Sequence, residues 1–200
     1  MEMWVGIFLL ILLVLIVFFS KSESKRKGNE GERIVKKRLN RLKKSKYTII
    51  NDVSFSINGK ISQIDHLVVS NFGIFVIETK NYKGMIFGRE NDSNWIQVLG
   101  RHKNQFYSPI RQNLGHIYAL KHVLREYNVP KLESIVVFTN RGELKVKSTT
   151  PVIHPRKLLK QIRRNNKEII CDELKSKLIQ RIKEENLNHR RILVKLKKAS

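Results

Sequence analysis

The sequence predicts one α/β domain with a mixed central sheet flanked by helices, preceded by one transmembrane helix. Three observations predict this class. An apolar run of 17 residues opens the chain, β-branched and aromatic runs of strand length follow it, and stretches with helical periodicity surround those runs. The length of 200 residues leaves room for one globular domain and an extension.

The apolar run, residues 3–19, is at the short end of the lengths that cross a bilayer. Glu2 is the first charge, and no small-residue cleavage site follows Phe19, so we expect an uncleaved anchor over residues 1–20. A buried core helix or an uncharged signal region is the alternative. Basic residues follow the run with only Glu23 opposed, and they are Lys21, Lys25, Arg26 and Lys27. This asymmetry predicts a single-pass protein of the cell membrane whose C-terminal domain is cytoplasmic.

Composition excludes several classes of protein. Cys171 is the single cysteine, which rules out a disulfide scaffold, a zinc ribbon and a Cys-ligated iron–sulfur protein. Lys and Arg total 40 against 17 Asp and Glu, giving a formal net charge of +23. So basic a chain attracts polyanions, and nucleic acid and the anionic inner leaflet are the two at hand. A solvated basic surface without a dedicated ligand is the alternative.

The first half of the domain is predicted to be a helix and three strands. Residues 21–29 are polar and form a basic linker, and the domain proper is expected over 30–155. Apolar residues recur at helical spacing from Glu30, with a basic face opposite them. The segments 48–55, 61–69 and 74–80 have strand composition, separated by turns at Asn58-Gly59 and 71–73.

The second half of the domain alternates between segments with strand patterns and segments with helical spacing. Gly84 and Gly88 bracket a short strand, residues 95–99 make another, and 109–127 return to helical spacing. The continuous apolar run 134–139 is typical of a strand buried on both faces. Because it follows a helix, it predicts a crossover and a mixed sheet. A short strand near Val152 and helices at 156–164 and 172–186 complete the chain, with 156–200 forming a basic helical extension.

Charged residues interrupt two of the predicted strands. Glu78 and Lys80 share one face of a largely apolar strand, about 7 Å apart. A turn centred between Asn71 and Phe72 places Asp65 opposite Glu78. A bulge at Gly73 would instead shift the pairing by one residue and turn Asp65 to the other face.

Two adjacent carboxylates repel each other unless a cation lies between them, and hard oxygen ligands favour Mg²⁺ or Mn²⁺. Asp65 and Glu78 are therefore candidate metal ligands. A metal held there, with the Lys80 ammonium beside it, suits the hydrolysis of a phosphodiester. An ordinary ion pair between Glu78 and Lys80 is the alternative.

Asp65 followed by Glu78-x-Lys80 resembles the PD-(D/E)xK nuclease signature, with Ile64 in place of its proline. The surrounding residues resemble the nuclease-related domain (NERD) family over about residues 30–125. The matching positions are Gly31-Glu32, Asn51-Asp52-Val53, 63–66, 73–82, Gly84, Gly88, Trp95, Pro109, Gln112-Asn113 and His116.

The resemblance implies a restriction-endonuclease-like fold and a Mg²⁺-dependent nuclease (phosphodiesterase) acting on DNA. It implies that Asp65 and Glu78 bind the metal, that Lys80 is catalytic, that Glu32 is a further acidic member and that Gln112 lies beside the site. Glu32 also suits the dipole at a helix N-terminus without any catalytic role.

Other interpretations remain open. Gln112 could equally cap its helix or face solvent, and the apolar surroundings of His66 and His116 favour structural imidazoles. Trp95 is expected in the core. For the whole protein, a non-catalytic module that binds nucleic acid or another partner at the membrane is the alternative, followed by a protein that binds anionic lipid.

Overall fold

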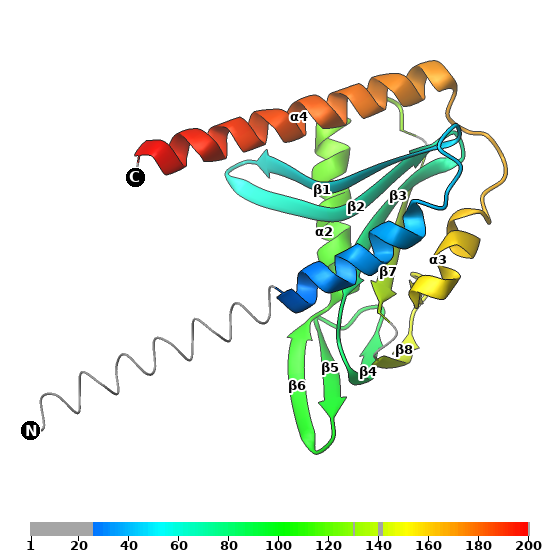
Figure 1. Cartoon of the computed structure of the whole chain (residues 1–200), viewed down its shortest axis with the longest axis vertical. Helices are drawn as coiled ribbons and strands as arrows, with labels where there is room; N and C mark the ends of the chain where they lie inside the picture. The colour runs from blue at the N-terminus through cyan, green and yellow to red at the C-terminus, as the bar shows by residue number, and fades with distance from the viewer. Residues whose placement is uncertain (1–25, 130, 140–141, 200) are drawn as a thin grey trace, which may run out of the picture.

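The computed structural model describes residues 26–129, 131–139 and 142–199. Within them, two mixed sheets are flanked by helices (Figure 1). The larger sheet has the order β1-β2-β3-β7-β9, and the smaller has the order β6-β5-β4-β8. The strands are β1 Tyr47–Ile57, β2 Lys60–Ser70, β3 Gly73–Lys80, β4 Gly84–Arg89, β5 Asn94–Leu99, β6 His102–Tyr107, β7 Leu132–Phe138, β8 Gly142–Lys147 and β9 Val152–Ile153.

The α/β class and the mixed sheet flanked by helices are confirmed, but the strands form two sheets where the sequence predicted a single central one. Strand β3 ends at Lys80, and the chain enters β4 at Gly84 with a φ of +78°, where a Cβ atom would overlap the Val98 carbonyl oxygen. This tight turn starts a second sheet instead of extending the first. Trp95 of the smaller sheet stacks on Phe138 of the larger, with ring centroids 6.2 Å apart, so the two sheets share a buried apolar cluster.

The predicted three-strand meander is confirmed, and Asn71 and Phe72 alone form the turn between β2 and β3. Strand β1 changes face at Asp52, which has a φ of +54°. Tyr47, before Asp52, belongs to the core under the N-terminal helix, whereas Val53 and Phe55 belong to the core under α2 and α4. The left-handed residue therefore lets one hairpin contribute to both layers of the core.

Strand β7 lies parallel to β3, from the pair of Ile74 with Leu132 to the pair of Lys80 with Phe138. Strand β9 is parallel to β7. These pairs confirm the predicted crossover and mixed sheet. The sequence from Ile135 to Phe138 is fully buried, as its continuous apolar run predicts.

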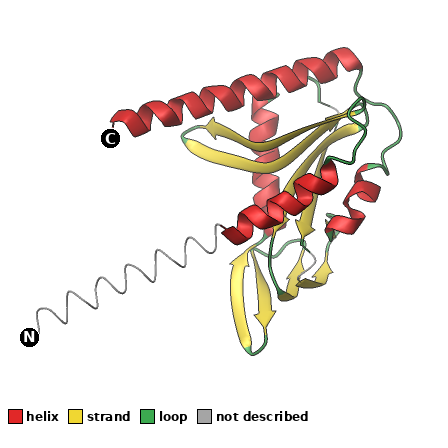
Figure 2. Ribbon diagram, viewed as in Figure 1, coloured by secondary structure: helices red, strands yellow, loops and turns green. Residues whose placement is uncertain are grey.

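Helices cover both faces of the larger sheet (Figure 2). An N-terminal helix covers residues 26–39 and shares one core layer with α3 (Pro155–Ile162). Helices α2 (Pro109–Val123) and α4 (Asp172–Ala199) enclose the other layer. The N-terminal helix is thus already formed at residue 26, before the expected start at Glu30, and Asn81 Nδ2 donates a hydrogen bond to the Lys27 carbonyl there.

Two helix ends differ from the prediction. Helix α2 ends at Val123 instead of residue 127, because the backbone at its cap, Leu124, leaves the helical path. Helix α4 continues past residue 186 to Ala199, since no Gly or Pro interrupts it.

Strands β6 and β8 are absent from the prediction. Strand β6 is polar along most of its length and lacks an apolar alternation that would mark a strand. Strand β8 does alternate half-buried Leu144 and Val146 with exposed Lys145 and Lys147, so its sequence contained a usable signal.

The predicted anchor, residues 1–20, lies outside the described residues. None of the helices within the described ranges combines the length and hydropathy needed to cross a bilayer.

A pair of glycine substitutions tests the contact between the sheets. A Cβ atom at Gly88 would overlap the Trp95 ring, so Gly88→Ala should lower the free energy of unfolding by about 1–3 kcal/mol. Gly115, inside α2, has open space where a Cβ atom would lie, with no described atom within 4 Å, so Gly115→Ala should raise that free energy by about 0.5–1 kcal/mol. Urea unfolding of both variants measures the difference, and equal stabilities would contradict this packing.

Candidate active site

The candidate site lies where β2 and β3 stop pairing. Their last backbone pair is His66 with Ile77, in the register that the predicted turn at Asn71 and Phe72 gives, and Asp65 and Glu78 are the next residues beyond it. Asp65 Oδ2 accepts a hydrogen bond from the Thr79 backbone N–H at 2.8 Å. The Asp65 carboxylate therefore occupies the place where a ladder bond would otherwise hold the two strands together.

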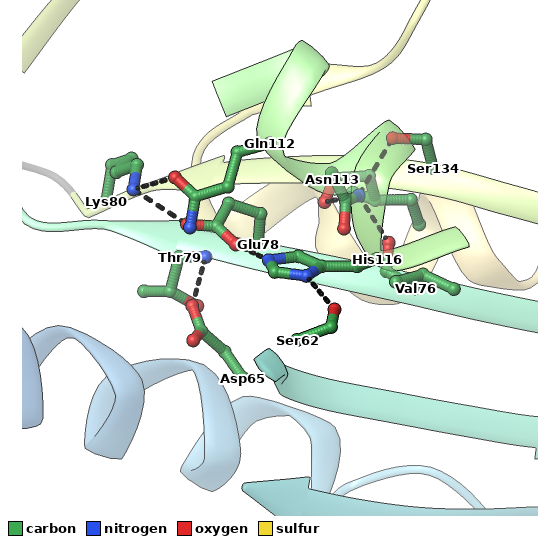
Figure 3. Close-up of polar contacts among 11 residues, drawn as sticks. Ser62, Asp65, Val76, Glu78, Thr79, Lys80, Gln112, Asn113, His116 and Ser134 are labelled. Atoms are coloured by element: carbon green, nitrogen blue, oxygen red, sulfur yellow. Dashed lines mark hydrogen bonds and ion pairs between the residues drawn. The ribbon is translucent and has the colours of Figure 1, made fainter. Parts of the chain in front are cut away.

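Glu78, Lys80 and Gln112 form a connected set of side chains (Figure 3). The Lys80 Nζ atom lies 2.7 Å from Glu78 Oε1 and donates to Gln112 Oε1 at 2.8 Å. The side chain of Glu78 is 2% exposed and that of Lys80 is 17% exposed. The lysine is thus fixed by two acceptors from β3 and α2 while part of it still reaches solvent.

His116 is a further residue of this site, although its apolar surroundings favoured a structural role. Its Nδ1 atom is hydrogen-bonded to Ser62 Oγ at 2.8 Å, and its Nε2 atom lies 3.3 Å from Glu78 Oε2. The latter contact has ion-pair distance without hydrogen-bond alignment. The spacing of four residues between Gln112 and His116 puts both on one helix face, and this was the available sequence signal.

Asn113 docks α2 on the larger sheet. Its buried Nδ2 group donates to the Val76 carbonyl and to Ser134 Oγ, both at 2.8 Å. These bonds tie the first turns of α2 to β3 and β7 at once. Gln112 and His116, on either side of Asn113, are thereby held against Glu78.

The carboxyl groups of Asp65 and Glu78 have their pKa values shifted in opposite directions. Burial, followed by the charge of Glu78, raises the pKa of Asp65 to about 8, against smaller lowering effects of the Thr79 N–H and Lys80. Burial also raises the pKa of Glu78, but its contacts with His116 and Lys80 outweigh that effect and leave the pKa below its ordinary value. Glu78 is therefore the ionised member at neutral pH, and Asp65 holds a proton in the absence of a cation.

Glu32 interacts with the site through its charge. Gly31 brings the N-terminal helix close to β3, since a Cβ atom there would lie 2.9 Å from Asn81 Cβ. Burial, then the charges of Asp52 and Glu78, raise the pKa of Glu32. Glu32 is therefore near enough to Glu78 to sense its charge, but among the described contacts it has no direct bond to Lys80 or Gln112.

His66 lies on the opposite face of β2 from Asp65. Its Nδ1 atom is 2.7 Å from Asn51 Oδ1. Burial, followed by the charge of Lys36, lowers the pKa of His66 to about 4, so the ring is neutral. Its contacts fit the structural imidazole that the sequence predicts.

A cavity of about 560 Å³ opens beside Lys80, between the N-terminal helix and β5. Lys27, Lys80 and Lys83 supply its charge, and Tyr82 and Leu99 supply apolar surface. A groove with three cations and few acids suits an anionic ligand that reaches the lysine of the site.

The donor set fits a hard divalent cation. Within the described residues, the buried Glu78 Oε2 atom has no hydrogen-bond partner, and neighbouring carboxylates raise the pKa of Asp65 and Glu32. No set of three or more His, Cys, Asp and Glu side chains in the described ranges forms a ready ligand shell. Two carboxylates are nevertheless enough for Mg²⁺, which usually keeps several waters and takes its other ligands from the substrate.

The fold and these side chains define a class of protein, the nuclease-related α/β domains with an Asp…Glu-x-Lys site. Residues 27–139, more than half of the chain, match the nuclease-related domain (NERD), and the chain belongs to this family of the PD-(D/E)xK superfamily. It is also 37% identical over 129 residues to an uncharacterized protein of Bacillus anthracis. That match covers 62% of this chain and 61% of the relative. No solved structure matches the chain significantly.

The raised pKa of Asp65 predicts a pH dependence of stability. An unfolded Asp ionises near 3.8, whereas Asp65 in the folded protein ionises near 8, so the folded state holds this proton more tightly. Its contribution to stability is complete below pH 3.8 and is lost as the pH rises through about 8. Asp65→Asn stays neutral and still accepts the Thr79 N–H, so this variant should gain stability over wild type as the pH rises. Urea unfolding in EDTA at several pH values measures this, and parallel profiles would contradict it.

Proposed function

We propose that this protein is a membrane-anchored, Mg²⁺-dependent nuclease that hydrolyses DNA phosphodiester bonds. The observation that carries the proposal is the meeting of Asp65, Glu78 and Lys80 at the point where β2 and β3 stop pairing, with Gln112 holding the lysine. Membership of the nuclease-related domain family supports the same chemistry.

Each side chain has a role in this chemistry. Asp65 and Glu78 would hold Mg²⁺ or Mn²⁺, which supplies a Lewis acid for a phosphoryl oxygen and lowers the pKa of a bound water. The Lys80 ammonium stabilises negative charge that develops on the phosphate. Gln112 keeps the Lys80 Nζ atom in place, and His116 with Ser62 orients the second oxygen of Glu78.

Charge supports a nucleic acid as the substrate. The formal net charge is +23, and the cavity beside Lys80 adds Lys27 and Lys83. The N-terminal helix and the turn after it carry a second basic surface, where Arg33, Lys37 and Arg41 lie at intervals of four residues and line a cavity of about 300 Å³. Basic surfaces of this kind suit a chain of phosphates. The choice of DNA follows from the superfamily.

Cleavage assays test the proposal directly. The full-length chain in detergent is incubated with supercoiled plasmid in Mg²⁺, Mn²⁺ or EDTA. Wild type should nick the plasmid only with a divalent cation. Asp65→Asn should lose at least 10²-fold in rate, on the order of other electrostatic catalytic groups, and keep its DNA affinity.

Glu126→Gln is the matched control, because it makes the same carboxylate-to-amide change at an exposed residue beyond α2. This variant should cut like wild type. DNA binding without cation-dependent cutting by wild type would contradict the nuclease and favour a tethered binding module. Equal residual cutting by Asp65→Asn and wild type would mean contamination and would equally remove the support for this site.

We further propose that residues 3–19 anchor the chain in the membrane, on the strength of their uninterrupted apolar sequence and the adjacent basic residues. After cell fractionation the full chain should remain with membranes at high salt and at alkaline pH. A chain lacking residues 1–20 should be released. Release of the full chain by salt alone would show that it is held by charge and not by an anchor.

A further inference from the structure

The smaller sheet has one buried and one outward face. Ile86 and Trp95 point inward and are fully buried in the cluster shared with the larger sheet. Met85, Phe87 and Ile96 point the other way, and each is 37–38% exposed. Phe87 is paired with Ile96 across β4 and β5, so these two side chains are neighbours. The outward surface therefore has an apolar centre.

Basic residues border this centre in register. Strand β8 lies parallel to β4 and pairs Lys145 with Phe87 and Lys147 with Arg89. Alternation along the strands puts the side chains of these residues on the outward surface. The three cations among them, Arg89, Lys145 and Lys147, are exposed. The outer face is defined here as Met85, Phe87, Arg89, Ile96, Lys145 and Lys147. A shallow cavity of about 410 Å³ lies over five of these residues.

Acidic residues only partly offset this charge. Glu143 Oε1 lies 2.6 Å from Lys145 Nζ, but the two side chains are 59% and 52% exposed. Such an exposed pair is weak and is readily exchanged for a phosphate. Asp92 is turned towards the backbone, where its Oδ2 atom accepts from the Arg89 N–H. The outer face therefore remains basic.

An exposed aromatic ring among apolar side chains, bordered by cations, matches the chemistry of a single-stranded nucleic acid. Bases stack on the ring while the cations hold the phosphates. A duplex does not offer its base faces to such a surface. Two copies of this chain would bring like charges together here, so a single strand fits the face better than self-association.

The outer face is joined to the candidate active site by short connections. Strand β4 begins directly after the loop 81–83 that follows Lys80. Strand β6 ends at Tyr107, and Gln112 lies in the first turns of the next helix. In Figure 1 the smaller sheet extends from the end of β3 that carries the site. Strand β4 thus carries Phe87 and Arg89 of the outer face within ten residues of Lys80 along the chain.

We propose that the outer face of the smaller sheet binds single-stranded nucleic acid, with Phe87 stacking on a base and Lys145 and Lys147 contacting the phosphates. As the substrate-holding surface of a nuclease, it rests on the function proposed above. Its binding of a single strand does not require cleavage and can be tested apart from it.

The test measures binding of a fluorescein-labelled oligothymidylate to the full-length chain in detergent, by anisotropy in EDTA so that no cleavage intervenes. Phe87→Ala should raise Kd about tenfold, as expected for loss of one stacked base. Lys145→Ala combined with Lys147→Ala should weaken binding and reduce the slope of log K against log salt by about 1.4, because about 0.7 is lost for each phosphate contact.

Matched controls remove one exposed aromatic ring and two exposed cations elsewhere. Tyr118→Ala removes an aromatic that is 63% exposed on α2, and Lys121→Ala with Arg125→Ala removes two exposed cations near the far end of that helix. Both controls should bind like wild type. Thermal unfolding of every variant checks that the fold is kept, which is expected because Phe87 is partly exposed.

The outcomes separate the two proposals. If Phe87→Ala and the double lysine variant bind like wild type while wild type still cuts plasmid, the outer face is overturned and the nuclease stands. If binding depends on Phe87 but wild type never cuts, the outer face stands and the nuclease fails. A change in oligomeric state on light scattering for Phe87→Ala, with unchanged oligonucleotide affinity, would make this a protein contact and overturn the proposal.

Discussion

The carboxylate of Glu78 is charged and almost fully buried. The elements around it supply contacts that offset the free energy lost when this charge leaves water. An unpaired carboxylate at such a place would destabilise the fold by several kcal/mol. Lys80 pairs with one oxygen, and His116 approaches the other. Both partners need α2 to lie against β3, because Gln112 holds the lysine and His116 itself is on that helix. The bonds of Asn113 to β3 and β7 provide this docking.

The position of Asp65 beside Glu78 makes the Asp65 carboxyl harder to ionise. Burial of Asp65, and then the ionised Glu78 beside it, make ionising Asp65 unfavourable, and the Thr79 N–H offsets only part of that cost. Asp65 therefore holds a proton at the place where a cation would stabilise the ionised carboxylates most. The same repulsion extends to Glu32 on the N-terminal helix. A divalent cation would offset the repulsion between these carboxylates and stabilise both in their ionised form. This is the physical reason to connect the site with metal-dependent chemistry.

The two sheets divide the surfaces that a nucleic acid would meet. The larger sheet carries the carboxylates and the lysine, whereas the smaller carries exposed cations around Phe87. The cluster of Trp95 and Phe138 fixes one sheet against the other. Because the loop 81–83 leads directly from the candidate site into the smaller sheet, this contact between the sheets also sets the distance between Lys80 and the outer face.

Local patterns were enough to predict the meander, the buried strand β7 and the register of β2 against β3, and they singled out Asp65, Glu78, Lys80 and Gln112 as candidate site residues. Each depends on neighbours in sequence: apolar alternation, a two-residue turn, or a short motif. The second sheet, the place of His116 and the shift of the Asp65 pKa were decided by tertiary structure. Polar strands such as β6 carry little local signal, and electrostatic effects depend on which charges the fold brings together and buries. The sequence determined which groups are available, and packing decided which of them meet.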